Sequence, residues 1–304
     1  MDKSDNKSEN ICEIEHDYAA NHTNDNRCAP SKQFENESCI PLDLLILLAD
    51  AYNKSVGKKI ILVDAKYNKC PSQYKKYLLK KISKELKQCQ DQKCWMAQDF
   101  ARHLNREKFE ELTTNTFRPE GPQGKFEWLN TVNINNVMQQ YELKYPDFKF
   151  LEAVPMDFME LGYYGFIKEE LIKLHNSNNI NKIGIIFNLD NHDQSGSHWV
   201  ALYSDFKKKQ IYFSDSVGNN PHKNVANYMN ILKDTINDIN SDASKKIDVK
   251  INKVQHQKGN SECGVYSLNF IIRLLDGDTF NKFCETRISD GEINKFRDIY
   301  FTKK

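Results

Sequence analysis

The chain passes from a polar, extended segment into an apolar helix in the stretch Gln255-His256-Gln257-Lys258-Gly259-Asn260-Ser261-Glu262-Cys263-Gly264-Val265-Tyr266-Ser267-Leu268. Apolar residues at helical spacing predict that this helix buries one face: Val265, Leu268, Ile271, Ile272 and Leu275. A thiol in the first turn lies near unpaired N–H groups and the positive end of the helix dipole, which favour the thiolate. We therefore interpret Cys263 as a candidate nucleophile. Ser261 or Glu262 can cap the helix, and Gly264 would give a substrate backbone room to approach.

The alternative for Cys263 is a small buried hydrophobic residue, which is the common fate of a free cysteine. His198 and Asp215 favour catalysis, because His198 opens a predicted strand at 199–203 and Asp215 closes the next one at 210–214. Paired neighbouring strands can bring such ends within hydrogen-bond reach. Asp215 would then orient the imidazole, while Gln257 and the Cys263 backbone N–H would donate to an oxyanion.

Two other histidines compete with His198 for the role of the base. His192 lies in the middle of a loop without an evident orienting partner, and strand alternation points His256 away from Gln257. Taken singly, each of His198, Asp215 and Gln257 would more often be a turn or surface residue. The prediction of a catalytic site therefore depends on the whole set.

The composition gives few hints of a partner. The chain has 304 residues, and 43 Lys and Arg nearly balance 42 Asp and Glu, so nucleic acid is not indicated. There is no apolar segment of a secretory signal at the start, and the longest apolar run, residues 44–49, is too short to span a bilayer. We expect a soluble protein that is not secreted and does not bind membranes, whose eight cysteines are reduced thiols rather than disulfides.

Cys89 and Cys94 have a spacing that raises the possibility of zinc. His103 is the only nearby candidate for a third ligand, and a lone cysteine pair without a second pair rarely makes a structural site. We therefore expect no metal site and no cofactor.

The segment 118–124, Arg-Pro-Glu-Gly-Pro-Gln-Gly, breaks any helix and marks the predicted domain boundary. Residues 1–117 are expected to form a mostly helical arm, with helices near 41–52, 72–88 and 94–112. Within this arm, residues 1–32 are expected to be poorly ordered. Residues 118–304 alternate helices with strands at 183–187, 199–203, 210–214 and 247–251. This pattern predicts an α+β fold, a central mixed β-sheet with the helix of Cys263 packed on it.

The motifs occur in the order His198-Trp199, Asp215-Ser216 and Gln257-x5-Cys263-Gly264. This order resembles the cysteine-protease family of the SUMO-specific proteases and the adenovirus protease. The segments 188–190, 196–201, 213–219 and 262–268 most resemble the polyprotein proteases of nucleocytoplasmic large DNA viruses such as African swine fever virus. The resemblance extends from Pro119 to Arg297 and more weakly into the arm. It departs at Asp215, where the swine fever enzyme has an asparagine.

The resemblance implies that Cys263 is the nucleophile, His198 the base, Asp215 the third member of the triad and Gln257 the oxyanion donor. It also implies substrate contacts by Trp199, Gly264, Asn188 and Asp190, with Trp199 walling a channel for small residues. The implied function is cleavage of viral structural polyproteins after Gly-Gly-Xaa-like sites during virion maturation. The implied location is the virion and the host cytoplasm, and the arm would dock the substrate.

Three other functions stay open from the sequence. The first is an isopeptidase that removes SUMO or other ubiquitin-like proteins from host conjugates. The second is an acyltransferase with the same triad, for which no acetyl-donor pocket is recognisable. The third is a structural protein that keeps the fold without catalysis, although no catalytic residue is missing.

Overall fold

The computed structural model describes residues 10–20, 25–124, 126–162, 167–240 and 245–302. The chain divides into two compact units, one up to Arg118 and one from Pro119 to Thr302. This division falls within the helix-breaking segment 118–124.

The first unit consists of short helices around its own apolar core. In chain order these are α1 (Leu42–Val56), η1 (Ala65–Lys69), α2 (Pro71–Glu85), α3 (Gln92–Met96), η2 (Asp99–His103) and α4 (Arg106–Thr114). Leu44 and Leu48 of α1 are buried in one cluster with Tyr74, Leu78 and Ile82 of α2. The third predicted helix, 94–112, is broken into α3, η2 and α4. Leu104 is extended there, and Asn105 caps α4 by accepting a hydrogen bond from the backbone N–H of Lys108.

Two sequence predictions for this unit are wrong. Residues 10–20 and 25–32 were expected to be poorly ordered, yet Ile11 and Ala29 are buried; residues 1–9 and 21–24 lie outside the described part. Six of the eight cysteines, expected as thiols, form the disulfides Cys12–Cys70, Cys28–Cys39 and Cys89–Cys94. The first joins the N-terminal segment to the N-cap residue of α2, and the second closes a loop that precedes α1.

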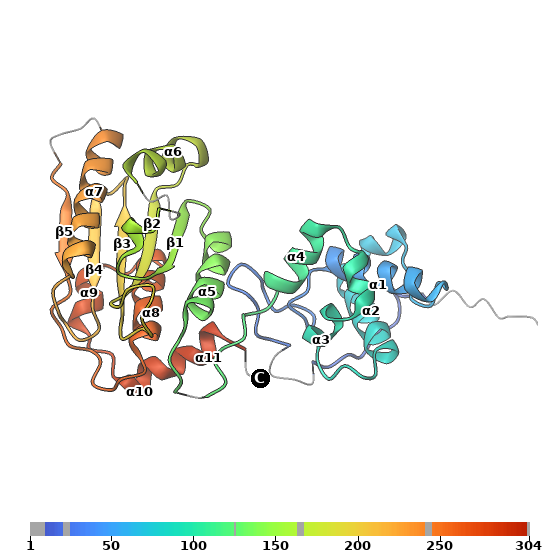
Figure 1. The fold of residues 1–304 in the computed structure, drawn as a ribbon. Coiled ribbons are helices and arrows are strands. Elements are labelled where there is room, and N and C mark those ends of the chain that lie inside the picture. Colours follow the sequence, from blue (N-terminus) through green and yellow to red (C-terminus); the bar gives the residue numbers. More distant parts are fainter. Residues whose placement is uncertain (1–9, 21–24, 125, 163–166, 241–244, 303–304) are drawn as a thin grey trace, which may run out of the picture. The chain divides into compact units, whose positions relative to one another are not determined.

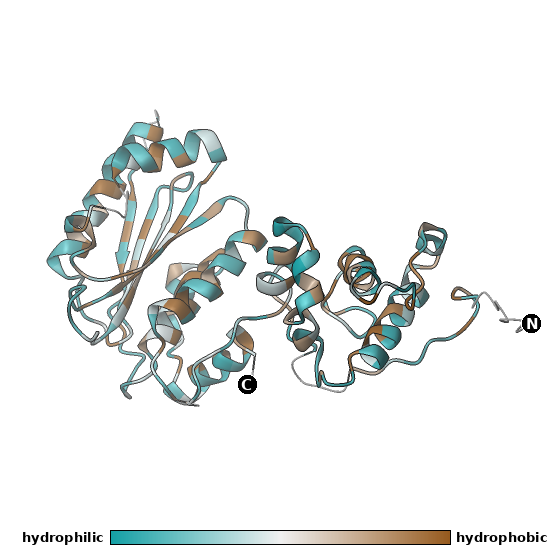
Figure 2. Ribbon diagram, turned by 45° about the vertical axis from the view of Figure 1, so that its right-hand side comes forward, coloured by the Kyte–Doolittle hydropathy of each residue, from teal (hydrophilic) through white to brown (hydrophobic). Residues whose placement is uncertain are grey.

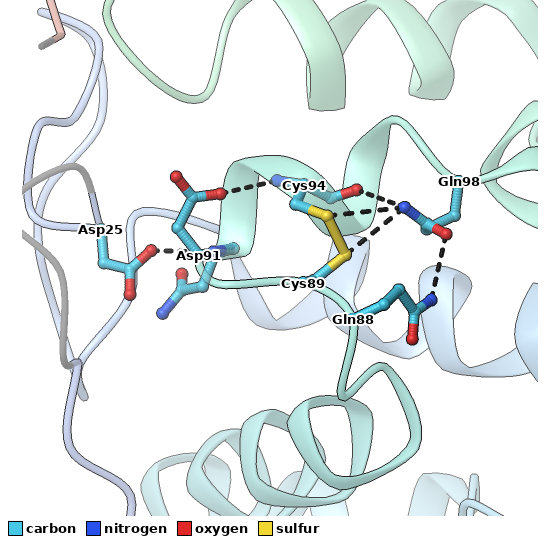
Figure 3. The surroundings of a disulfide bond; sticks show 7 residues. Asp25, Gln88, Cys89, Asp91, Cys94 and Gln98 are labelled. Carbon is cyan, nitrogen blue, oxygen red and sulfur yellow. Dashed lines mark hydrogen bonds between the residues drawn. A yellow bond between two sulfur atoms is a disulfide. The ribbon is translucent and has the colours of Figure 1, made fainter. Parts of the chain in front are cut away.

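The disulfide between Cys89 and Cys94 lies beside the amide of Gln98 (Figure 3). Gln98 Nε2 is 3.4 Å from the sulfur of Cys89 and 3.5 Å from that of Cys94, and it donates to the Cys94 carbonyl at 3.1 Å. The two sulfurs are bonded to each other and therefore do not act as thiolate ligands of a zinc ion.

The second unit has three layers, with helices on both faces of a five-stranded mixed sheet (Figure 1). The strands lie in chain order and are β1 (Phe148–Val154), β2 (Lys182–Asn188), β3 (Trp199–Asp205), β4 (Gln210–Ser214) and β5 (Asp248–Ile251). The pairs β2–β3 and β3–β4 are antiparallel, and the two outer pairs are parallel. The helices are α5 (Thr131–Lys144), α6 (Lys168–Asn178), α7 (Lys223–Ile239), α8 (Cys263–Leu275), α9 (Phe280–Glu285), α10 (Asp290–Ile293) and α11 (Arg297–Tyr300), with η3 (Phe158–Glu160) and η4 (Asn294–Phe296).

The sheet is apolar on both faces, and brown residues recur along its strands in Figure 2. On β3, Ala201 and Tyr203 face the cluster that contains α5 and α8, whereas Val200 and Leu202 face the cluster of α6 and α7. Burial on both faces explains why these strands read as nearly continuous apolar runs. The predicted α+β fold, a central mixed sheet with the Cys263 helix packed on it, is confirmed; strand β1 was not predicted.

No helix within the described ranges is long and apolar enough to cross a membrane.

The disulfides predict the outcome of an alkylation experiment. Unfolded in urea without reductant, the chain should take up iodoacetamide at only two cysteines, Cys263 and Cys284, because disulfide sulfurs are not nucleophiles. After reduction it should take up eight labels, counted by intact mass. The Cys284→Ala variant should show one label fewer in each sample. Eight labels without reductant would contradict the disulfide assignment.

Candidate active site

Four elements of the second unit bring polar side chains to one edge of the sheet. His198 immediately precedes β3, Asp215 immediately follows β4, and the pairing of Ala201 with Ser214 places these two strand ends together. β2 also ends at this edge, with Asn188 opposite Trp199. Cys263 is the first residue of α8, which packs on β3.

His198 interacts with the carboxylate of Asp215 and with Cys263. Its Nε2 is 2.7 Å from Asp215 Oδ1, and Cys263 is the second side chain that raises the pKa of the imidazole. Burial lowers the pKa of His198, but the hydrogen bonds to Asp215 and Cys263 outweigh it and raise the pKa to about 9. The imidazole is therefore a cation at neutral pH.

Asp215 is held in place by more than the histidine. Its Oδ1 accepts a hydrogen bond from the Val217 backbone N–H at 3.0 Å, and its carbonyl accepts one from Asn252 Nδ2 at 3.0 Å. Burial raises the pKa of Asp215, but the hydrogen bonds from His198 and Val217 outweigh it and hold the pKa below its usual value. The carboxylate is therefore ionised beside a protonated imidazole.

The sequence predicts that Ser261 or Glu262 caps α8. Within the described residues, however, no side chain forms an N-cap hydrogen bond with this helix. Glu262 at the N-cap has helical backbone angles, and its carboxylate accepts hydrogen bonds from the backbone N–H and the hydroxyl of Ser261. The turn therefore leaves the first N–H groups of α8 without a side-chain cap, on the side of the Cys263 thiol.

Gln257 is buried, and its amide has a fixed orientation. Ser216 Oγ donates to Gln257 Oε1 at 2.6 Å, and Gln257 Nε2 donates to the Gly259 carbonyl at 3.0 Å. A primary amide has two N–H donors, so this arrangement leaves one of them for another acceptor. Ser216 belongs to the sequence motif, where no role could be assigned to it, and its role in orienting Gln257 becomes evident only from the fold.

A pocket of about 440 Å³ adjoins the site on the side of Trp199. Asn188 and Asp190, two of the predicted substrate contacts, line it together with Trp199, Trp128 and Leu129. The indole Nε1 of Trp199 donates to the Leu129 carbonyl at 2.8 Å, which fixes the orientation of the ring. Sequence reasoning missed Trp128; the signal available was a tryptophan just after the helix-breaking segment, and its side chain is 41% exposed.

Gly264 packs closely on Leu129. A Cβ at this position would lie 3.0 Å from Leu129 Cβ, so the glycine makes room for Leu129. His192 differs from the prediction, since it has an orienting partner. Its Nδ1 is 2.6 Å from Asp157 Oδ2, and its backbone N–H donates to the other carboxylate oxygen of Asp157. Of this pair, His192 lines the pocket.

His256, the other competing imidazole, is fully buried between the rings of Tyr266 and Phe283. The backbone N–H of Ile288 donates to its Nδ1 at 3.3 Å, and its Nε2 has no hydrogen-bond partner in the described part. Burial, together with the charges of Arg273 and Arg287, lowers the pKa of His256 to about 4. It is therefore a neutral core residue.

This environment predicts an acid-sensitive fold. Because the pKa of His256 is lower in the folded than in the unfolded chain, its contribution is complete above pH 6.5 and is lost as the pH falls toward 4. The slope from this group is at most about 1.4 kcal/mol per pH unit. The His256→Gln variant should show a shallower fall in the free energy of urea unfolding between pH 7 and 5. Equal slopes in both proteins would contradict the assignment.

Comparison with known proteins gives the family of this fold and site. Residues 157–304 match the Ulp1 protease family, C-terminal catalytic domain. A protein of Acanthamoeba polyphaga mimivirus described as a thiol protease is 37% identical over 290 residues, which cover 91% of this chain and 93% of the relative. A protein of African swine fever virus described as a SUMO-1 cysteine protease is 28% identical over 251 residues, covering 74% of this chain and 90% of the relative.

The crystal structure of an African swine fever virus protease shares the fold, with a TM-score of 0.63 at 22% identity over 91% of this chain and 96% of that chain. The mimivirus match, at 37% identity over nearly the whole of both chains, shows common family membership. The chain therefore belongs to the Ulp1 family of cysteine proteases, and the relatives that it matches over most of its length are viral proteins.

Proposed function

We propose that this chain is an endopeptidase that cleaves viral structural polyproteins after Gly-Gly-Xaa-like sites during virion maturation, in the virion and the host cytoplasm. In this proposal Cys263 is the nucleophile, His198 the acid and base, Asp215 the group that orients His198, and Gln257 the oxyanion donor. The observation that carries it is the 2.7 Å contact of His198 Nε2 with the buried carboxylate of Asp215, beside Cys263, which together with Asp215 raises the pKa of His198.

The proposed reaction begins with a proton on His198 and a thiolate on Cys263. The thiolate attacks the scissile carbonyl, and the imidazolium gives its proton to the leaving amine as the C–N bond breaks. A water molecule then gives a proton to the neutral imidazole and attacks the thioester. The thiolate leaves, and the carboxylic acid product and the ion pair are formed. Asp215 keeps the ring in one orientation through both steps.

The oxyanion of each tetrahedral intermediate needs donors that are in place beforehand. The second N–H of Gln257 Nε2 and the uncapped backbone N–H of Cys263 are the donors that we assign. Ser216 supports this assignment, because its hydrogen bond to Oε1 fixes which end of the Gln257 amide donates.

The proposed preference for glycine follows from the aromatic pocket. Trp199 is 5% exposed and is anchored to the Leu129 carbonyl, so it is a rigid wall. Trp128 lines the same pocket. A substrate without side chains before the scissile bond would pass beside Trp199 to reach Cys263. Asn188 and Asp190 would supply polar contacts to its backbone.

Residues 1–117 are proposed to form an arm domain that docks the polyprotein. The mimivirus relative matches 91% of this chain, whereas the match to the Ulp1 catalytic domain begins at residue 157. The arm is therefore shared with a viral relative but lies outside the matched catalytic domain.

A second candidate function is removal of SUMO or ubiquitin-like proteins from host conjugates. It is favoured by the description of the swine fever virus relative as a SUMO-1 cysteine protease. Both candidates use the same chemistry and differ in the substrate alone. The acyltransferase alternative has no such support, because the relatives are described as proteases.

The test compares the wild type with Cys263→Ala on a fluorogenic Gly-Gly-Xaa peptide and on a SUMO conjugate. Loss of the nucleophile should lower kcat on the order of 10⁶-fold, as in the best-studied serine protease. The matched control is Cys284→Ala, which removes the other free thiol and should keep full activity.

Cleavage of the peptide but not of the conjugate would support the polyprotein protease. Cleavage of the conjugate alone would support the second candidate. Full peptide cleavage by Cys263→Ala would refute the assigned nucleophile. A peptide with valine in place of the second glycine should be cut at least about tenfold more slowly, since it brings a branched side chain to the Trp199 wall.

The pH profile tests the role of Asp215. Because the pKa of His198 is raised to about 9, the imidazolium persists at neutral pH and is lost above pH 9, where kcat/KM should fall. The Asp215→Asn variant keeps a hydrogen-bond acceptor but loses the negative charge, so this basic limb should move to lower pH by about one unit or more. The control is Asp278→Asn, which removes a carboxylate that pairs with Arg273 on α8. A basic limb at the same pH in Asp215→Asn would contradict the role.

A further inference from the structure

Arg297 is a buried arginine at the start of α11, with an exposed fraction of 9%. Its Nε donates to Asn294 Oδ1 at 2.8 Å, its Nη1 to the Glu127 carbonyl at 2.8 Å and its Nη2 to the Ser261 carbonyl at 2.9 Å. Burying a guanidinium is costly, and here backbone carbonyls from two distant segments satisfy two of its nitrogens.

The two carbonyls belong to the two sides of the candidate site. Glu127 directly precedes Trp128 and Leu129, which line the pocket. Ser261 begins the turn that ends at Cys263. A guanidinium is planar, and its donors have a fixed spacing. Arg297 therefore fixes the distance between the pocket wall and the nucleophile turn.

Two further contacts hold the same wall segment. The indole of Trp199 on β3 donates to the Leu129 carbonyl, and Leu129 packs on Gly264 of α8, where a Cβ would lie 3.0 Å from Leu129 Cβ. These contacts fix the wall at Leu129, while Arg297 fixes it at Glu127. Trp128 lies in the chain between these two residues, so its backbone is held on both sides.

We propose that Arg297 is a positioning residue for the protease reaction, which sets the spacing between the Trp128–Leu129 wall and the Cys263 turn. A peptide held against the wall then presents its scissile carbonyl to the thiol at the right distance. Misplacement by about 1 Å can cost on the order of 100-fold in rate. This inference rests on the proposed peptidase function and adds no chemical step to it.

A residue that only stabilised the fold would behave differently. Its loss would lower every reaction of Cys263 in parallel, through the folded fraction. Loss of a positioning residue should affect reagents that use the pocket and spare those that do not. The ratio of the two rates therefore separates the two roles.

The experiment measures the second-order rate constants for labelling Cys263 by two reagents in the full-length protein. Iodoacetamide reacts without the pocket, whereas a Gly-Gly peptide vinyl sulfone must lie against the wall. The Arg297→Lys variant keeps the charge and much of the packing but lacks the paired Nη1 and Nη2 donors that bind the Glu127 and Ser261 carbonyls. Its peptide-to-iodoacetamide rate ratio should fall about 10- to 100-fold, with iodoacetamide labelling within twofold of wild type.

Asn294→Ala is a milder variant, because it keeps the guanidinium and removes only its Nε acceptor, together with the hydrogen bond from Asn294 Nδ2 to Glu262 Oε1. Its ratio should fall in the same direction by a smaller factor. The matched control is Arg273→Lys. Arg273 lies in α8 and donates to Asp278, so this variant should leave the ratio unchanged.

An unchanged ratio in both Arg297→Lys and Asn294→Ala would overturn the inference, as would a parallel loss of both rates. Failure of the proposed function is a separate result, namely a wild-type enzyme that cleaves neither the Gly-Gly-Xaa peptide nor a SUMO conjugate.

Discussion

The hydrogen bond between His198 Nε2 and Asp215 Oδ1, 2.7 Å long, constrains the rest of the second unit. Asp215 is 1% exposed, and an ionised carboxylate at such a position is stable only with its partners in place. The partners of the carboxylate come from the start of β3 and from the turn at Val217, while Asn252 beyond β5 donates to the backbone carbonyl of the same residue. These segments must therefore fold together around the charge. The same charge keeps His198 protonated, so the requirement for stability and the requirement for catalysis coincide.

The three-layer sheet supplies the rigid frame for this pair. β3 is buried along its whole length and carries His198 directly before it and Trp199 as its first residue. One strand therefore positions both the proposed base and the wall of the pocket. α8 packs on β3 and brings Cys263 to the same edge, where its first turn lacks a side-chain cap. The geometry of the candidate site therefore depends on where β3 begins, where β4 ends and where α8 begins.

The sequence predicts those parts of the fold that depend on local pattern. β2, β3 and β4 are apolar runs bounded by polar turns, so the sequence alone places His198 and Asp215 at strand ends. β1 was missed because it has an irregular register between Phe150 and Ala153, with Glu152 at a φ of +65°, which breaks the regular pattern. The disulfides were missed because the state of the cysteines was predicted from the expected cellular compartment alone. The partner of His192, Asp157, lies 35 positions away in the chain and carries no local signal.

Reacting residues are easier to recognise in a sequence than residues that position the site. A nucleophile, a base or an acid must be a particular side chain, so its identity appears in the motif. Two of the three acceptors that Arg297 uses are the carbonyls of Glu127 and Ser261, and every residue type provides a carbonyl. Likewise Gly264 matters through the volume that Leu129 fills, not through chemistry of its own. The proposed chemistry therefore rests on the motifs in 198–263 alone. The fit of a substrate to that chemistry depends also on the segments around 127–129 and 294–297, whose contacts only the fold reveals.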